Sequence, residues 1–145
     1  MKENVKEGEE KLQKLYLEFQ MLEQQIKHLE KQSNTLKNHL LELISTSQSL
    51  EEIKKVEERA EVLVPISTGI YAKAELKDKN SFIVNVGANI AATKDLESTK
   101  KIISEQIKEI SEVHENVAQE LQRHLEKAAS MEEEINKVAS ELQAQ

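Results

Sequence analysis

The chain has 145 residues, of which 38% are hydrophobic, 3% aromatic and 32% charged, with three Gly, one Pro and no Cys. Such a composition is typical of long, solvent-exposed helices, and it argues against a compact globule, a disordered chain or any disulfide or thiolate site. The formal net charge of −7 argues against a nucleic-acid partner, because binding to phosphates needs a basic surface.

The N-terminal stretch MKENVKEGEEKLQ contains no apolar run of the kind that a signal peptide has. Nowhere in the chain do about 18 apolar residues follow one another, which is the length that a helix needs to cross a bilayer. We therefore expect a soluble, cytoplasmic protein that has no membrane partner.

A heptad repeat follows, in which apolar residues recur every three and four positions between residues 12 and 43. Its d positions are all Leu, and Ser33 is the one polar residue among its a positions. The repeat predicts a helix from Lys2 to Ile44. Such a helix needs a partner, because its apolar stripe is otherwise exposed to water.

The spacing of apolar residues changes in the middle of the chain. Small polar residues crowd in STSQS, and Ser49 with Glu52 forms the pattern of a capping box, which predicts a separate short helix that ends near Glu58. The period then falls to two in EVLVPI, IYAKAEL and SFIVNVG, and a short IAAT follows. These segments, separated by STG, KDKN and GAN, predict four strands in two hairpins. Pro65 is expected at a strand edge or end, because proline cannot donate to a ladder.

A second heptad repeat runs from residue 96 to residue 142. Every a and d position in it is apolar except Lys100, His114 and His124. We call the a and d positions of the two repeats, which would face the partner helix, the seam. We expect this helix to begin near Asp95, with Thr93 or Asp95 as its N-cap. The two long helices are similar in length, so each is the natural antiparallel partner of the other. Two registers of the helix pair are possible, and they differ in whether the numbers of two residues that face each other add up to 143 or to 150. We favour the register with the sum of 143, because it leaves the two ends of the chain level with each other.

The four strands are expected to complete their sheet with other subunits. About 30 residues with one apolar face and two open edges are marginally stable alone. We therefore expect the hairpins of several subunits to pair into one shared β-structure, which we call the β-body. The alternative is a small sheet within one chain that packs against the end of the coiled coil next to the strands. The residues expected to form the shared body are Val62, Val64, Ile66, Ile70, Ala72, Ala74, Phe82, Val84 and Val86.

No catalytic, cofactor-binding or metal-binding pattern is found in the sequence. The three glycines are too far apart to form a phosphate-binding loop, and the four histidines do not have the HExxH spacing. His114 and His124 are interpreted as seam residues that set the register, and a metal-ligand role is the alternative. We expect no enzyme activity, no cofactor and no metal.

Three apolar residues near the N-terminus lie outside the seam. Tyr16 falls at an e position, Leu17 at f and Met21 at c, so Leu17 and Met21 point away from the partner helix. The preferred hypothesis is a surface for varied protein clients; packing against another helix and no role at all are the alternatives. Seam residues at fraying helix ends complete the predicted client-binding set, and these are Val5, Leu12, Ile135, Val138 and Leu142.

The central segments EVLVPISTGIYAKAELKD and SFIVNVGANIAATKDLE, flanked by heptad helices, resemble the prefoldin family and within it the archaeal α-type subunits. The most specific parts are Leu63 to Leu76 and Asn85 to Ala91. The resemblance implies a hexamer of two α-type and four β-type subunits, with a double β-barrel that carries six coiled-coil tentacles. It also implies an ATP-independent holdase that captures unfolded proteins and passes them to a group II chaperonin.

Together these predictions describe an α+β protein, in which a long antiparallel coiled-coil hairpin carries a central four-stranded segment that assembles into an intersubunit β-barrel. Residues 1–58 supply the first long helix and the short helix, 59–93 the two β-hairpins, and 94–145 the second long helix, in a single domain. The alternative function is a structural scaffold or filament-forming protein, in which the β-body polymerises and the helices act as spacers.

Overall fold

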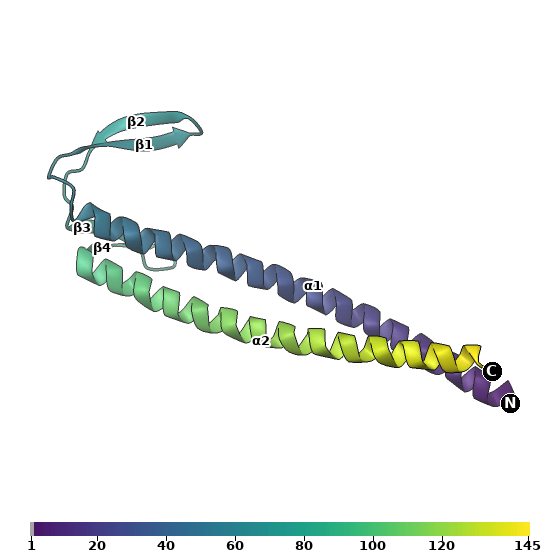
Figure 1. The fold of residues 1–145 in the computed structure, drawn as a ribbon. Coiled ribbons are helices and arrows are strands. Elements are labelled where there is room, and N and C mark those ends of the chain that lie inside the picture. The colour runs from purple at the N-terminus through teal and green to yellow at the C-terminus, as the bar shows by residue number, and fades with distance from the viewer. Residues whose placement is uncertain (1) are drawn as a thin grey trace. The chain divides into compact units, whose positions relative to one another are not determined.

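The computed structural model describes residues 2–145 and contains two long helices with four short strands between them in sequence (Figure 1). These elements are α1 (Lys2–Ile53), β1 (Glu61–Ser67), β2 (Ile70–Glu75), β3 (Ser81–Asn85), β4 (Ala91–Asp95) and α2 (Leu96–Gln143). The α+β class, with a coiled-coil helix on each side of two β-hairpins, is confirmed. The chain forms two compact units, which we call the helical unit (residues up to Asn38 with Ser111–Gln145) and the hairpin unit (His39–Ile110).

In the helical unit, α1 and α2 run antiparallel, and both chain ends lie at the same end of the unit (Figure 1). The seam contains one cluster of buried side chains, and five partly buried residues pack against it. The buried members are Leu15, Leu22, Ile26, Met131, Ile135 and Val138, and the partly buried ones are Leu12, Phe19, Leu121, Ala128 and Leu142. All of them come from predicted a and d positions. The heptad pattern therefore identified the core of this unit.

The register of the two helices is visible where Leu142 lies against Gly8. A methyl group added at the Gly8 Cα would lie 2.7 Å from Leu142 Cδ2. These two residue numbers sum to 150, so the favoured sum of 143 is wrong at this end of the seam. Level termini were a poor guide, because a glycine in the seam leaves space that a leucine can fill. Further along, Ser33 Oγ lies 3.3 Å from His114 Nε2 across the seam, which fits a polar role there.

The expected short helix from Ser49 to Glu58 is wrong, because α1 continues without a break to Ile53. Thr46 Oγ1 donates to the Glu42 carbonyl oxygen at 2.8 Å, and Ser49 Oγ donates to that of Ser45 at 3.0 Å. The hydroxyls thus bond the preceding turn of the helix instead of capping a new one. Leu50, which is buried, extends the apolar stripe through this region.

The four strands form two separate two-stranded antiparallel sheets, β1 with β2 and β3 with β4. Val64 faces Ala72 in the first hairpin, and Ile83 faces Thr93 in the second. The register of the first shifts between Pro65 and Ser67, as expected of a strand in which proline cannot donate to the ladder. The turn between β1 and β2 contains Gly69 at a φ of 80°, a conformation that glycine adopts without strain.

The junction between β4 and α2 has a single capping residue. Asp95 Oδ1 accepts a hydrogen bond of 2.7 Å from the Ser98 backbone N–H, while Thr93 belongs to the β4 ladder. Asp95 is therefore the N-cap, and Thr93 is not. The Ser98 hydroxyl and backbone N–H both stabilise the ionised carboxylate, so they hold the pKa of Asp95 below its ordinary value.

Candidate protein-binding surfaces

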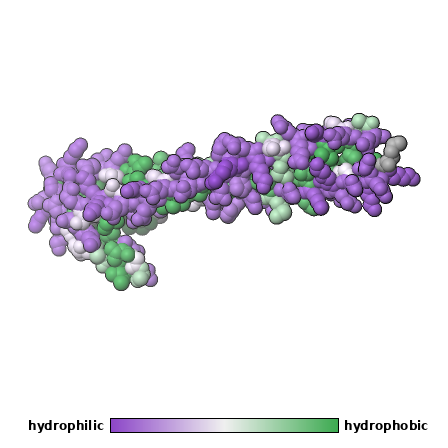
Figure 2. Space-filling model, turned by 90° about the horizontal axis from the view of Figure 1, so that it is seen from below, coloured by the Kyte–Doolittle hydropathy of each residue, from purple (hydrophilic) through white to green (hydrophobic). Residues whose placement is uncertain are grey.

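The outer face of α1 carries the three apolar residues that the heptad does not use. Tyr16, Leu17 and Met21 are 50%, 63% and 62% exposed, while the neighbouring seam residues Leu15 and Leu22 are buried. Leu17 and Met21 are four residues apart and lie next to each other on the helix surface. We call Tyr16, Leu17 and Met21 the outer patch. Figure 2 shows that hydrophilic side chains cover most of the molecular surface seen in that view, so exposed apolar side chains are a minority there.

The predicted client-binding residues near the helix ends are less accessible. Ile135 and Val138 are buried in the core cluster, so the expectation that fraying exposes them is wrong. The physical reason is that α2 stays helical to Gln143, which keeps its last seam residues packed. Leu12 and Leu142 are partly buried against the same cluster.

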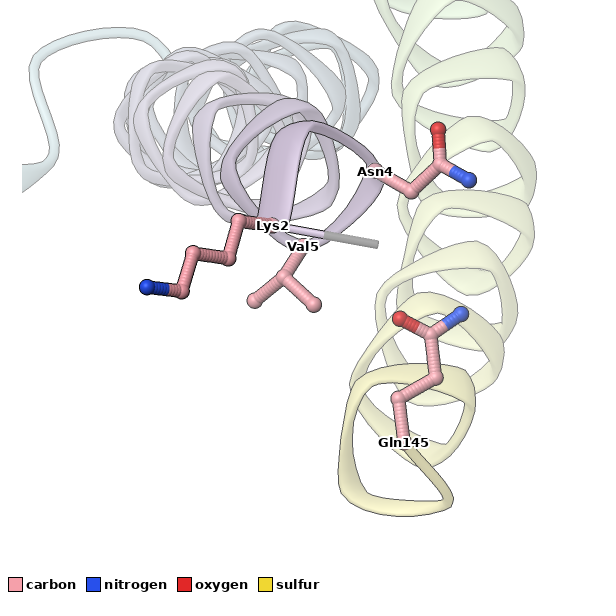
Figure 3. A pocket seen from close by; sticks show the side chains of 4 residues that line it. All are labelled: Lys2, Asn4, Val5 and Gln145. Atoms are coloured by element: carbon pink, nitrogen blue, oxygen red, sulfur yellow. The ribbon is translucent and has the colours of Figure 1, made fainter.

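Val5 is the member of this set that borders an open space. It is partly buried, and with Lys2 and Asn4 of α1 and Gln145 after α2 it lines a hollow of about 400 Å³ (Figure 3). The hollow presents one apolar side chain among three polar ones, so it offers less apolar surface than the outer patch does.

A groove between α1 and α2 was not predicted from the sequence. It consists of two open hollows of about 420 and 430 Å³ that share His28. The first hollow is lined by Met21, Gln24, Gln25, His28, Leu29, Glu120 and His124, and the second by His28, Lys31, Gln32, Thr35, Leu36, Val113 and Val117. We call this feature the interhelical groove. The signal that sequence reasoning missed is the pair Gln25 and Gln32, which puts neutral residues at the g positions that flank the seam.

The hairpins expose apolar side chains on both faces. Of the nine residues predicted to form the shared β-body, Val62, Ala74, Phe82 and Val84 are partly buried, and Val64, Ile66, Ile70, Ala72 and Val86 are exposed. Ile83, on the opposite face of its hairpin, is 82% exposed, and Leu63 and Tyr71 are exposed as well. The prediction of one apolar face was therefore incomplete.

A cluster of ion pairs joins the ends of the helices within the hairpin unit. Lys100 Nζ contacts the Glu51 carboxylate, and Lys54 Nζ lies 3.2 Å from Glu97 Oε1. The hydrogen bond between Lys100 and Glu51 lowers the pKa of Glu51 and raises that of Lys100. All four charges have a partner, so the cluster is structural and offers no free group for chemistry.

Residues 2–145 lack two other kinds of site. The structure places no group of three or more His, Cys, Asp or Glu side chains there in positions to bind a metal ion. None of the helices within these residues has a stretch that is both long enough and apolar enough to span a membrane. The exposed apolar side chains of the outer patch and of the hairpins therefore remain the candidate surfaces for binding other proteins.

Comparisons with known proteins point to one family. The family model "Prefoldin subunit" matches residues 22–141. The chain is 39% identical to prefoldin subunit alpha of Thermococcus onnurineus over 104 residues, which is 71% of each protein. It is 30% identical to prefoldin subunit alpha of Pyrococcus horikoshii over 138 residues, covering 92% of this chain and 93% of the relative. A solved structure of filamentous PFD from Methanocaldococcus jannaschii has the same fold, with a TM-score of 0.69, 22% identity and coverage of 78% of this chain and 93% of that one.

Proposed function

This chain belongs to the prefoldin family of chaperones, and we propose that it is a cytoplasmic holdase subunit that binds unfolded proteins without ATP. The observation that carries this proposal is the outer patch. Leu17 and Met21 are each more than 60% exposed on a face that the coiled coil does not use. An adjacent leucine and methionine form an adaptable apolar surface, which suits clients of different sequence.

The size of the outer patch favours capture by several subunits at once. Burying one Leu or Met side chain stabilises a complex by about 1.5–3 kcal/mol, whereas association costs about 4–15 kcal/mol. One patch of three side chains therefore holds a client weakly. Several patches on one assembly raise the apparent affinity by about 100-fold or more without any new kind of contact. Weak individual contacts also allow release without nucleotide hydrolysis.

The family and its solved structure support assembly with other prefoldin subunits. We propose a hexamer of two copies of this chain and four β-type subunits, joined by the hairpins in a double β-barrel. The exposed apolar side chains on both hairpin faces support this proposal, as do the unpaired edges of each two-stranded sheet. Transfer of clients to a group II chaperonin is proposed from the family alone.

The holdase proposal is tested by removing the outer patch from the assembled protein. Leu17→Ser with Met21→Ser is expected to leave the mass of the assembly with a β-type subunit unchanged. The same variant is expected to weaken suppression of client aggregation at least tenfold, because each lost side chain removes up to about 1.5–3 kcal/mol of contact per patch, and about 1.4 kcal/mol is a tenfold change in affinity. Light scattering of a chemically unfolded client after dilution, without ATP, measures the effect.

The matched control for this experiment lies further along the same helix. Leu41 and Ile44 are also exposed, 56% and 43%, but belong to the hairpin unit. Leu41→Ser with Ile44→Ser removes a similar amount of apolar surface and is expected to retain suppression. Suppression that is unchanged in the Leu17 and Met21 variant excludes the outer patch from the client site.

A scaffold or filament former is the alternative function. The Methanocaldococcus jannaschii protein is filamentous in its solved structure, and at 22% identity the likeness shows the fold alone. Electron microscopy of this chain, alone and with a β-type subunit, separates the two functions. We expect closed particles with projecting arms, whereas open-ended polymers favour the scaffold.

A further inference from the structure

The two hairpins of this chain are joined by residues 76–80, which we call the hairpin linker. It follows the end of β2 at Glu75 and precedes the start of β3 at Ser81. Within residues 2–145, no hydrogen-bonded ladder connects the sheet of β1 and β2 with the sheet of β3 and β4. The direction of one hairpin relative to the other therefore depends on how the hairpin linker is held.

The first residue of the hairpin linker is held by the chain that precedes β1. The backbone N–H of Leu76 donates to the Ala60 carbonyl oxygen at 2.9 Å, and the Leu76 carbonyl oxygen accepts from the Arg59 N–H at 3.1 Å. These two bonds extend the pairing of β1 with β2 to Leu76. The remaining residues of the linker, 77–80, lie beyond this pairing and need other contacts to hold them.

The side chain of Lys79 reaches the C-terminal end of α1. Its Nζ donates to the carbonyl oxygens of Lys54 and Val56, at 3.5 and 3.3 Å. Lys79 is partly buried, whereas Lys77 in the same linker is exposed. Lysine side chains are rarely removed from water, so the partial burial of Lys79 indicates that its side chain is held against the end of the helix.

The end of α1 is a favourable place for a cation. The last carbonyl groups of a helix have no partner within the helix, and they form the negative end of its dipole. The last turn of α1, residues 50–53, contains two glutamates and no basic residue. Lys54 follows it, but its ammonium group is paired with Glu97 at 3.2 Å. Lys79 thus brings a positive charge to this helix end from a distant part of the sequence.

The backbone around Lys79 is arranged for this contact. Asp78 Oδ1 accepts a hydrogen bond of 2.9 Å from the Asn80 N–H, which closes a turn around Lys79. On another side the linker borders an open hollow of about 380 Å³, where it is not packed. The hollow is lined by Lys54, Lys79, Asn80, Asp95, Leu96 and Glu97. The hydrogen bonds of Lys79 therefore connect an otherwise loosely packed linker to α1.

We infer that Lys79 is a positioning residue for subunit assembly. It fixes the hairpin linker to the end of α1 and so holds the second hairpin in the direction that the subunit interface needs. This inference rests on the proposed assembly through the hairpins. A hairpin whose direction is fixed beforehand loses less conformational freedom when it joins other subunits. Lys79 acts through the linker and not through a contact with another subunit.

The test removes the charge of Lys79 and keeps a side chain of similar length. Lys79→Met is compared with Lys79→Arg, whose guanidinium group can donate to both carbonyl oxygens and should rescue the function. Lys77→Met is the matched control, because it makes the same change of charge at an exposed position of the same linker. All variants are full chains, and circular dichroism verifies that their helix content equals that of the parent.

Hydrogen exchange in the unassembled chain measures how firmly the linker is held. We expect the backbone amides of residues 76–81 to exchange about two- to fivefold faster in Lys79→Met than in the parent, because the interaction of one cation with a helix C-terminus corresponds to a factor of this size. The amides of α1 and α2 should exchange at the rates of the parent. Lys79→Arg and Lys77→Met should not differ from the parent anywhere.

Assembly is measured by native mass spectrometry with a β-type subunit over a dilution series. We expect Lys79→Met to need about two- to fivefold more protein for half-assembly than the parent does. Lys79→Arg and Lys77→Met should assemble as the parent does. Equal assembly by Lys79→Met and the parent overturns the inference, as does equal weakening in Lys77→Met or a failure of Lys79→Arg to restore assembly.

Failure of the inference is distinguishable from failure of the proposed assembly. If the parent assembles and Lys79→Met assembles equally well, the hairpins join the subunits without help from Lys79. If the parent itself does not assemble with the β-type subunit, the proposed assembly is wrong and the inference falls with it.

Discussion

Gly8 lies against the side chain of Leu142 in the seam near the chain ends. A glycine inside a helix is less stable than alanine by about 0.5–1 kcal/mol, but a methyl group at this position would meet Leu142 at 2.7 Å. The atom that it meets is the end of a flexible side chain, which can rotate away. We therefore expect Gly8→Ala to stabilise the protein by about 0.5 kcal/mol, less than the full propensity gain. Urea unfolding followed by circular dichroism measures the difference.

The control for Gly8→Ala is the same substitution in a Leu142→Ala background. With the larger side chain removed, nothing opposes the added methyl group, and the gain should rise to about 1 kcal/mol. A gain that is equal in both backgrounds would contradict the contact between Gly8 and Leu142. The register in which facing numbers sum to 150 would then be wrong as well.

At the scale of elements, the ends of α1 and α2 in the hairpin unit are joined by charge. Lys100 contacts Glu51 and lies 4.0 Å from Glu97, while Lys54 contacts Glu97. The side chain of Lys100 is 22% exposed and that of Glu51 52%, so water and salt screen the pair only in part. Lys100 occupies a seam position, where the other helix places a carboxylate instead of an apolar side chain.

The pH dependence of the Lys100–Glu51 pair follows from its two pKa shifts. The pKa of Glu51 is lowered from 4.5 by its hydrogen bond to Lys100, so its contribution to stability is present above pH 4.5 and lost as the pH falls through the folded value. The pKa of Lys100 is raised from 10.5 by the same bond, so its contribution is present below pH 10.5 and lost as the pH rises through the folded value. The pair stabilises the protein between these limits.

Lys100→Met is expected to lower the melting temperature at neutral pH and low salt, because it leaves Glu51 without this partner. The difference from the parent should shrink below about pH 4.5 and in about 1 M salt. Calorimetry across a pH series measures it. Lys101→Met, at an exposed position outside the cluster, is the control and should differ little from the parent at any pH. A difference between Lys100→Met and the parent that is the same at pH 3 and pH 7 would show that packing, and not charge, joins the helix ends.

The elements that the sequence predicted are those whose pattern is repeated many times. Heptads identified both long helices and their buried faces, and alternation between turn residues identified the first three strands, while the fourth was predicted from the short IAAT that follows the GAN turn. The prediction of a separate short helix was wrong at STSQS. There a single capping pattern predicts the start of a new helix, although the long helix continues. The hydroxyl groups there donate hydrogen bonds to backbone carbonyls one turn earlier in α1, as the bond from Ser49 Oγ to the Ser45 carbonyl oxygen shows. Burial of Leu50, which continues the apolar stripe of α1, therefore decides the structure of this segment over the local capping pattern.

The candidate site was predictable only where it lies on one helix. The positions of Leu17 and Met21 away from the seam follow from the heptad of α1 alone, and both are exposed. Predicting the interhelical groove requires the register of α1 against α2, and the sequence allowed two registers, with facing residue numbers that add up to 143 or to 150. Ile135 and Val138 were expected to be exposed by fraying of the helix end, but α2 stays helical to Gln143 and keeps both packed in the seam.

At the scale of the whole molecule, exposed apolar side chains occur in both units. The helical unit carries the outer patch and the groove, whereas the hairpin unit carries Val64, Ile70 and Ile83 on two-stranded sheets with open edges. An isolated two-stranded hairpin is marginally stable in water. The hairpins are therefore expected to gain their stability from other subunits, and the helical unit from its own seam.

Val64→Lys tests this division of roles. Val64 faces Ala72 in the middle of the first hairpin and is 43% exposed, so a lysine there is tolerated in the free chain but loses its hydration in a subunit interface. We expect native mass spectrometry with a co-expressed β-type subunit to show a shift from the full assembly to free chains, while circular dichroism shows unchanged helix content. Thr68→Lys, at the exposed turn between β1 and β2, makes the same change of charge and should assemble normally. If Val64→Lys assembles as the parent does, this face of the hairpin lies outside the interface.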